Sequence, residues 1–216
     1  MSNDYYQSRF VYEPGREAVW KEIAGYLQRF IPENAIVIDL GAGYCDFINQ
    51  IKARERYAVD VNLSLEKYVR KGVTPMAGKA EEMLRQFQDK SVTTVFSSNF
   101  LEHLEWPEIK NVTSQVKRIL VNKGRWIIIQ PNFKYAARDY FDDYTHRTVF
   151  TETSLSDYLK SEGFFTELKI ARFLPLSFHS RLPKSSLLVK IYLRLPVRPL
   201  ARQMLIIARK EEDVAE

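Results

Sequence analysis

The sequence predicts an α/β fold in which helices cover both faces of a doubly wound, mostly parallel sheet. Three observations point to this fold class. The length of 216 residues suits a single domain with a full core. Short apolar runs alternate along the chain with stretches of helical periodicity. The first run leads directly into Asp-Leu-Gly-Ala-Gly at 39–43, and in α/β sheets such loops lie at the carboxyl ends of strands.

The first half of the chain predicts four strands. A helix is expected over 16–30, with Val19, Trp20, Ile23, Leu27 and Phe30 on one apolar face and Pro32 at its end. Strands are expected to begin at Ala35 and to cover 57–61, 73–77 and 92–98, since each is a short run of apolar or β-branched residues. Helices between them are expected from Asp46, as an N-cap, and over 64–71 and 80–88.

The second half predicts three more strands. Pro107 suits the first position of a helix reaching 121, and Gly124 lies just past its end. A strand is expected at 125–130, a helix at 153–161, and two strands at 164–171 and 204–209. The segment 131–150 shows little periodicity. The expected organisation is one domain over 1–216: an N-terminal helical lid at 1–34, a core at 35–130, a substrate loop at 131–150 and a basic apolar insertion at 172–202.

Composition limits the function classes. The 45% hydrophobic content indicates a globular protein, and no run of 18 apolar residues predicts a spanning helix. The first residues lack the pattern of a signal peptide, and a single cysteine excludes an internal disulfide, so a cytoplasmic location is expected. Ten basic residues and one acidic residue lie in 164–210. The net charge of +5 therefore comes from the C-terminal region.

The loop after the first strand favours a cationic ligand. Gly41 and Gly43 allow a backbone to approach a ligand closely, but Asp46 stands where a dinucleotide fingerprint has its third glycine. A carboxylate there would repel phosphate, and Asp39 adds a second negative charge. Two acids around a glycine turn suit S-adenosylmethionine, which carries a sulfonium and an ammonium group.

Asp60 ends the second strand, 21 residues after Asp39. One βαβ unit fills that interval, and an acid at this place accepts hydrogen bonds from ribose hydroxyls. The spacing fits NAD equally well, so the loop chemistry alone separates the two ligands.

Together these motifs resemble the class I S-adenosylmethionine-dependent methyltransferases, and within them the group called methyltransferase type 11. Ile36-Val37-Ile38-Asp39-Leu40-Gly41-Ala42-Gly43 matches their first motif, and Leu101-Glu102-His103-Leu104 after the fourth strand matches closely. Cys45 replaces the usual third glycine, and Lys79 stands where many members carry an acid. The resemblance covers about residues 11–170. It implies a Rossmann-like seven-stranded sheet with an antiparallel last strand, and the donor would contact Asp39, Gly41, Ala42, Gly43, Asp60, Val61, Ala80, Glu81, Asn99 and Phe100.

The segment 131–150 should lie over the carboxyl edge of the sheet, because it follows the fifth strand. It interleaves aromatic rings, acids and basic residues, which is typical of substrate loops. The pattern Asp143-x-x-His146 with Thr148-x-Phe150-Thr151 resembles a branch of the family associated with polysaccharide and glycolipid biosynthesis. O-methylation of a small-molecule, saccharide or lipid-linked saccharide acceptor is expected. Tyr5, Tyr6 and Arg9 would fold over the acceptor.

Two histidines are the candidates for a general base, His103 and His146, because imidazole titrates near neutrality. Either could instead be a packing residue or tie down a loop. Asp139, Asp142, Asp143 and His146 could bind a metal ion. A solvated acidic loop, or ion pairs with Arg138 and Arg147, is the preferred interpretation, so no metal is expected. His179 lies in the basic tail and is expected to have no catalytic role.

The basic C-terminal region leaves several partners open. The mixture of bulky apolar and basic residues in 187–196 suits an anionic membrane surface or a lipid-linked acceptor. It equally suits an insertion that packs on the domain while its charges stay in water. An RNA methyltransferase and a non-catalytic module that binds S-adenosylmethionine are the alternatives. Aromatic residues are sparse between the charges, which makes RNA the less favoured partner.

Overall fold

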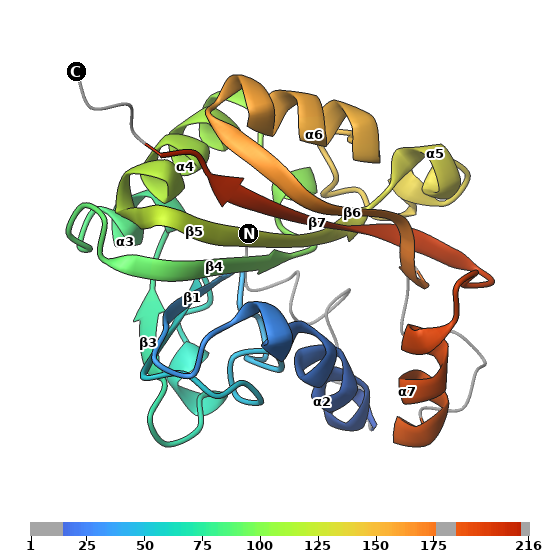
Figure 1. Ribbon diagram of the computed structural model, residues 1–216, viewed down its shortest axis with the longest axis horizontal. Helices are drawn as coiled ribbons and strands as arrows, with labels where there is room; N and C mark the ends of the chain where they lie inside the picture. The colour runs from blue at the N-terminus through green and yellow to red at the C-terminus, as the bar shows by residue number, and fades with distance from the viewer. Residues whose placement is uncertain (1–14, 176–184, 213–216) are drawn as a thin grey trace.

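A single seven-stranded sheet organises the molecule, in the strand order β3-β2-β1-β4-β5-β7-β6 (Figure 1). The computed structural model describes residues 15–175 and 185–212. The strands are β1 (Ile36–Leu40), β2 (Glu55–Asp60), β3 (Thr74–Ala77), β4 (Val92–Ser98), β5 (Leu120–Pro131), β6 (Phe164–Pro175) and β7 (Ala201–Lys210). Strand β7 runs antiparallel to both of its neighbours, while β1 to β5 are parallel. The predicted fold class, including the antiparallel last strand, is confirmed.

Helices cover both faces of this sheet. They are α2 (Arg16–Leu27), α3 (Ala80–Leu84), α4 (Trp106–Ile119), α5 (Phe133–Ala136), α6 (Glu152–Ser161) and α7 (Ser186–Arg194), with 3-10 turns η1 (Gln28–Phe30), η2 (Leu65–Lys67), η3 (Leu101–His103) and η4 (Tyr140–Asp142). Figure 1 shows α2 and α7 on one side of the sheet and α4 and α6 on the other. No helix of the described ranges is long and apolar enough to cross a membrane.

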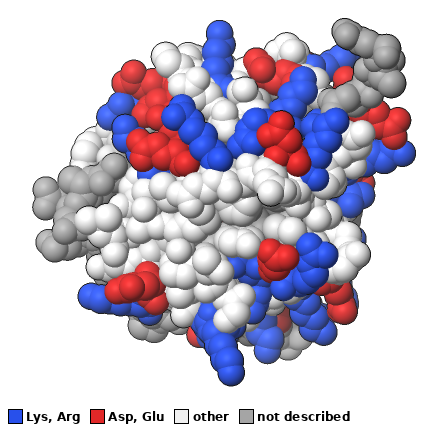
Figure 2. Space-filling view, turned by 90° about the vertical axis from the view of Figure 1, so that its left-hand side faces the viewer, with Lys and Arg blue, Asp and Glu red and all other residues white. Residues whose placement is uncertain are grey.

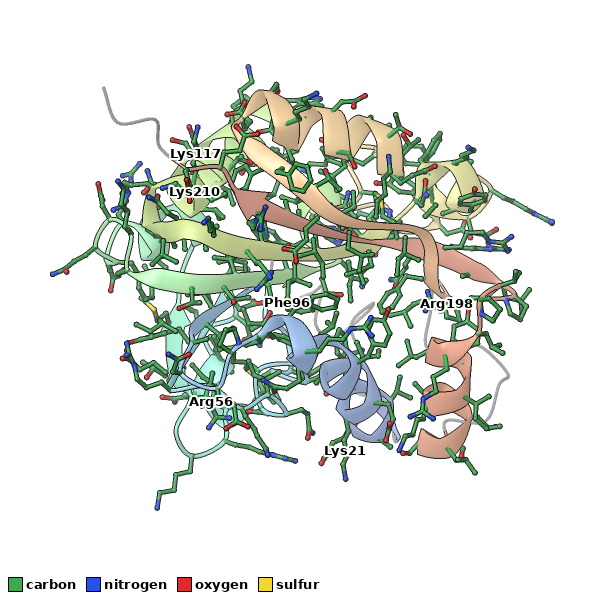
Figure 3. All side chains as sticks on the ribbon, in the orientation of Figure 1. Lys21, Arg56, Phe96, Lys117, Arg198 and Lys210 are labelled. Atoms are coloured by element: carbon green, nitrogen blue, oxygen red, sulfur yellow. The ribbon has the colours of Figure 1, made fainter. Side chains whose placement is uncertain are left out.

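The two faces of the sheet carry separate hydrophobic cores. Strand side chains alternate between faces, so Val37 of β1 packs with α2 while the next residue, Ile38, packs with α4. Phe96 of β4 points toward α2 in Figure 3. The ring of Phe96 meets Trp20 edge-on at a centroid distance of 6.2 Å and stacks on Phe47 at 3.6 Å. These aromatic contacts fix α2 beside the carboxyl half of β4.

Surface charge is mixed on the side of the molecule that bears α3. Figure 2 shows Lys and Arg interleaved with Asp and Glu above and below an uncharged band. This face therefore carries no continuous patch of one sign.

Two predicted helices are wrong. The stretch from Asp46 forms successive turns and no helix, and 64–71 contains only the three-residue turn η2. Cys45 has a φ of 58° at the entry to the first stretch, which is outside the helical region. Asp46 directs its carboxylate to Arg16, so it does not cap a helix at this point.

Several boundaries also differ from expectation. β5 begins directly after α4, at Leu120, and β6 continues to Pro175. Because β7 begins at Ala201, both ends of the expected insertion 172–202 belong to strands of the sheet. The expected contacts of Tyr5, Tyr6 and Arg9, residues 1–14 of the expected lid 1–34, and His179 lie outside the described residues.

Candidate active site

A cavity of about 460 Å³ lies at the carboxyl ends of β1, β2 and β4. Its wall contains all ten residues expected to hold the donor: Asp39, Gly41, Ala42, Gly43, Asp60, Val61, Ala80, Glu81, Asn99 and Phe100. The same wall continues through His103 to Tyr144, Thr145 and Arg147 of the segment after β5. The glycine loop and the expected substrate loop therefore share one cavity.

The glycine loop is held in a conformation that only glycine adopts easily. Gly41 and Gly43 have φ values of 71° and 53°, in the left-handed region. The amides of Gly41 and Ala42 both donate to the carbonyl of Val59, at 2.9 and 3.1 Å. A Cβ atom on Gly41 would lie 2.8 Å from Cδ2 of Phe100. The close packing explains why a side chain cannot be accommodated here.

Asp60 connects this loop to the next one. Its Oδ2 accepts a hydrogen bond from the amide of Gly43 at 2.8 Å, and its Oδ1 accepts one from the amide of Asn62 at 2.9 Å. The carboxylate lies on the cavity wall and is 7% exposed. These two amide donors fix the orientation of the carboxylate on the wall.

The three acids near the loop do not contribute equal negative charge. Burial, followed by the charges of Asp60 and Asp46, raises the pKa of Asp39 well above its usual range. Burial also raises the pKa of Asp46, and the guanidinium of Arg16 opposes that shift. Arg16 forms a buried ion pair with Asp46. The expectation that Asp46 presents an uncompensated charge to the ligand is therefore wrong, since α2 supplies its counter-ion.

Asn99 occupies the turn after β4 with a φ of 49°. Its amide donates to the carbonyl of Ile129 at 2.9 Å, and its Oδ1 accepts from Nε2 of Gln203 at 2.8 Å. Gln203 belongs to β7, more than 100 residues away. Sequence patterns gave no signal for this residue, because a single buried glutamine in an apolar strand has no motif.

The two histidines lie together, and their hydrogen bonds define their protonation. His103 lines the cavity, and the ring of His146 lies 4.9 Å from it, outside the residues of the wall. Nδ1 of His146 is 2.6 Å from the carbonyl of Tyr140. A carbonyl only accepts, so this Nδ1 carries the proton and Nε2 has the lone pair.

His103 is oriented through a relay. Its Nδ1 is 2.9 Å from Oγ1 of Thr145, and that hydroxyl donates to Oδ1 of Asp143 at 2.6 Å. Because the hydroxyl proton points to Asp143, Nδ1 of His103 donates to the threonine and Nε2 keeps a lone pair. Burial, with the neighbouring His146, lowers the pKa of His103 to about 4. At neutral pH this imidazole is therefore uncharged.

Glu102 is the functional candidate that sequence reasoning did not single out. Its side chain is fully buried, and neither carboxylate oxygen has a hydrogen-bond partner among the residues that the structure describes. Burial raises its pKa to about 8. One carboxylate oxygen of Glu102 and one ring nitrogen of each histidine, His103 and His146, lie within 4.8 Å of one another. The Leu-Glu-His-Leu motif contains this glutamate, but the local sequence does not show that its carboxyl group is buried.

Backbone hydrogen bonds fasten the two halves of this cluster. The amides of Arg147 and Thr148 donate to the carbonyl of Glu102, at 2.7 and 3.2 Å. The buried hydroxyl of Tyr140 donates to the carbonyl of Thr148 at 2.6 Å. The turn η3 and the loop 143–148 therefore form one fixed unit.

The expected ion pairs of the substrate loop are partly wrong. Asp139 pairs with Arg202 of β7, and Arg147 pairs with Glu105 at 2.8 Å. Asp143 is occupied by Thr145, with hydrogen bonds to its hydroxyl and amide. The acids at 139 and 143 therefore have different partners from those the sequence suggested.

A comparison with protein-family models gives a match to the cofactor-binding part of the chain. The model described as a methyltransferase domain matches residues 38–128, from β1 into β5, and so includes the glycine loop, Asp60 and the Glu102–His103 turn. Residues 38–128 form a methyltransferase domain similar to those of the class I S-adenosylmethionine-dependent methyltransferases. S-adenosylmethionine is the methyl donor of this methyltransferase and S-adenosylhomocysteine its product. A comparison with curated protein sequences gives no match.

Solved structures share the methyltransferase fold at low sequence identity. An S-adenosylmethionine-dependent methyltransferase from Archaeoglobus fulgidus is 21% identical, with 88% of this chain and 94% of that chain covered and a TM-score of 0.64. A chain from the Haloferax volcanii complex of the Trm112 methyltransferase activator with a putative methyltransferase is 14% identical, with both chains fully covered and a TM-score of 0.73. A possible histamine N-methyltransferase from Thermotoga maritima is 18% identical, with coverage of 97% and 95% and a TM-score of 0.67. These likenesses show the fold.

Proposed function

We propose that this methyltransferase transfers a methyl group to a hydroxyl oxygen of a saccharide-like small molecule or lipid-linked saccharide. The observation that carries the proposal is the single cavity, which joins the donor residues to a polar and aromatic mouth. Tyr144 is 70% exposed at this mouth and can lie flat against a sugar ring. Arg147 and Glu108 add donors and acceptors suited to several hydroxyl groups.

The reaction requires alignment and proton removal. The acceptor oxygen attacks the methyl carbon, a C–O bond forms, the C–S bond breaks and its electron pair stays on sulfur. The hydroxyl proton must leave, and the nearest groups of suitable chemistry are Glu102, His103 and His146. Most of the rate enhancement comes from holding donor and acceptor in line, because the sulfonium is already activated.

A labelling experiment tests the acceptor class. The purified chain is incubated with methyl-labelled S-adenosylmethionine and separate panels of oligosaccharides, lipid-linked saccharides, small amines and RNA. Label in an alkali-stable ether of a saccharide supports the proposal. Label in the amines alone would refute oxygen as the acceptor atom. Gly41→Ala serves as the control that lacks donor binding.

The same experiment decides the two alternatives. Label in RNA with steep salt dependence would replace the proposal by an RNA methyltransferase. The mixed charges of the face in Figure 2 give RNA no single-sign surface there. Binding of S-adenosylhomocysteine in calorimetry together with no label in any panel would indicate the non-catalytic module.

We also propose that α7 rests on an anionic membrane, which would bring a lipid-linked acceptor to the enzyme. Leu187 and Ile191 are 64% and 49% exposed, and helical spacing places Lys190 and Arg194 on the same face. Arg198 does not contribute, since it donates to the carbonyl of Leu193 and packs over Phe173; Figure 3 shows it between α7 and β7. Apolar and cationic side chains on one face match the interface of an anionic bilayer.

Vesicle co-sedimentation tests the membrane contact. The wild type should bind phosphatidylcholine vesicles that contain phosphatidylserine, and binding should weaken with salt. Leu187→Glu with Ile191→Glu should abolish it, whereas Phe165→Glu, at another exposed apolar residue on β6, should not. Absence of wild-type binding at low salt would refute this contact and leave the methyl-transfer proposal intact.

A further inference from the structure

The Glu102, His103 and His146 cluster brings a buried carboxyl group together with two imidazole rings. A carboxyl group buried without a hydrogen bond is destabilising by several kcal/mol, and buried polar atoms left without a partner commonly mark a site for an ion or ordered water. Glu102 is fully buried and has no such partner within the described ranges. It adjoins a cavity wall, through His103, and is not enclosed in the hydrophobic core.

We propose that Glu102, His103 and His146 bind one divalent transition-metal ion, such as Zn²⁺ or Mn²⁺, at the acceptor end of the cavity. The three side chains offer two nitrogen ligands and one oxygen ligand. This set suits such ions and is poorly matched to Mg²⁺ or Ca²⁺, which prefer oxygen alone. Three protein ligands leave coordination positions open for an acceptor oxygen.

The hydrogen bonds behind the cluster match those of metal-binding histidines. Such residues normally donate their second ring N–H to a carbonyl, hydroxyl or carboxylate, which fixes the ring and the ligating nitrogen. His146 donates from Nδ1 to the carbonyl of Tyr140, and His103 donates from Nδ1 to Thr145, which in turn donates to Asp143. In this tautomer the lone pair of each ring lies on Nε2, the nitrogen that would bind a cation.

The three side chains must move slightly closer together to bind a metal ion. The candidate ligand atoms lie within 4.8 Å of one another. Zinc bonds of about 2.0–2.1 Å at tetrahedral angles place ligands about 3.4 Å apart, so the side chains must draw together by roughly 1 Å. The backbone need not move, because amides of the loop 143–148 already hold it against the carbonyl of Glu102.

The catalytic consequence of this site rests on the proposed function. An acceptor hydroxyl coordinated to the cation would lose its proton more readily. The cation would then do what the sequence assigned to a free histidine base, and the expectation of no metal would be wrong. Binding of the cation does not depend on the acceptor, so it can be measured alone.

Metal titration of the purified chain tests the site. The protein is treated with a chelator, dialysed, and titrated with Zn²⁺ by calorimetry and with Mn²⁺ by electron paramagnetic resonance. The wild type should bind one equivalent. Glu102→Gln and His146→Gln should each weaken binding by at least about 100-fold, since loss of an outer partner alone weakens binding by about 10–100-fold. Glu108→Gln is the matched control, because it lies on the same cavity and glutamine also caps α4.

A second pair of variants covers the case in which Glu102→Gln does not fold. Thr145→Val keeps the size of the side chain but removes the support of His103, and should weaken metal binding by about 10–100-fold. Thr145→Ser should restore it. Each variant is also titrated with S-adenosylhomocysteine, which reports an intact donor site.

The outcomes separate the two proposals. No binding of Zn²⁺ or Mn²⁺ by the wild type overturns the metal site, as does wild-type affinity in folded Glu102→Gln and His146→Gln. Metal binding with no methyl transfer to any saccharide refutes the proposed function and leaves the site standing. Saccharide methylation by the chelated protein at the full rate would keep the proposed function and remove the cation from it.

Discussion

Replacing Arg16 by methionine isolates the ion pair that attaches α2 to the donor loop. The side chains of Arg16 and Asp46 are only 11% and 8% exposed, so the variant leaves a carboxylate without its counter-ion in a buried place. Breaking a buried pair in this way is destabilising by about 3–5 kcal/mol. The carboxyl can avoid part of this penalty by taking up a proton.

Protonation of Asp46 limits the loss of stability in Arg16→Met, and this limit depends on pH. From an ordinary aspartate pKa of about 3.9, neutralising the group requires about 4 kcal/mol at pH 7 and about 1.5 kcal/mol at pH 5. Burial already raises the pKa of Asp46 in the folded protein against the opposing effect of Arg16, and without Arg16 this pKa rises further. A raised folded-state pKa means that stability is lost as the pH increases. The penalty should therefore be about 3–4 kcal/mol at pH 7 and about 1.5 kcal/mol at pH 5.

Urea unfolding at the two pH values measures this effect by linear extrapolation. Arg16→Met combined with Asp46→Asn should recover much of the lost stability, because no buried charge remains. Arg70→Met breaks an exposed pair with Glu17 and should leave the free energy of unfolding almost unchanged. A penalty for Arg16→Met that is under 1 kcal/mol at pH 7, or equal at both pH values, would refute the reasoning.

Three further variants test other parts of the site. Gly41→Ala should abolish S-adenosylhomocysteine binding in calorimetry, because its Cβ would meet Phe100 and its φ is positive; unchanged affinity would contradict the packing. Asp60→Asn should weaken donor binding by about 10–100-fold and lower stability by about 1.5–3 kcal/mol, because one of the two hydrogen bonds that its carboxylate accepts from backbone amides is lost. A urea midpoint equal to that of the wild type would contradict this loss of stability. Tyr140→Phe should lower stability by about 1–2 kcal/mol and raise the acceptor KM while donor affinity stays constant; a change confined to donor affinity would contradict the assignment of the loop.

The sequence predicted the sheet well because its signals are local. Each parallel strand is a short apolar run, and strand ends carry the glycines and acids that the turns require. All ten predicted donor residues line one cavity for the same reason, since the parallel strands β1, β2, β3 and β4 end at one edge of the sheet. Their contacts with the donor remain predictions.

The errors come from contacts between distant parts of the chain. The helix expected at Asp46 assumed that the carboxylate would cap it, but Arg16, 30 residues away, binds it. The isolation of Glu102 depends on how a loop more than 40 residues later folds over it. Local patterns contain no information about such pairings, so neither could be predicted from the sequence.

The bond between Gln203 and Asn99 has a consequence for the order of folding. Strand β7 lies between β5 and β6, and it also supplies the amide that fixes the turn after β4. Every residue expected to touch the donor precedes residue 101, yet the turn that presents Asn99 is completed only by a strand that begins at Ala201. During synthesis on the ribosome, the nascent chain therefore cannot form its finished donor pocket until almost the whole polypeptide has emerged.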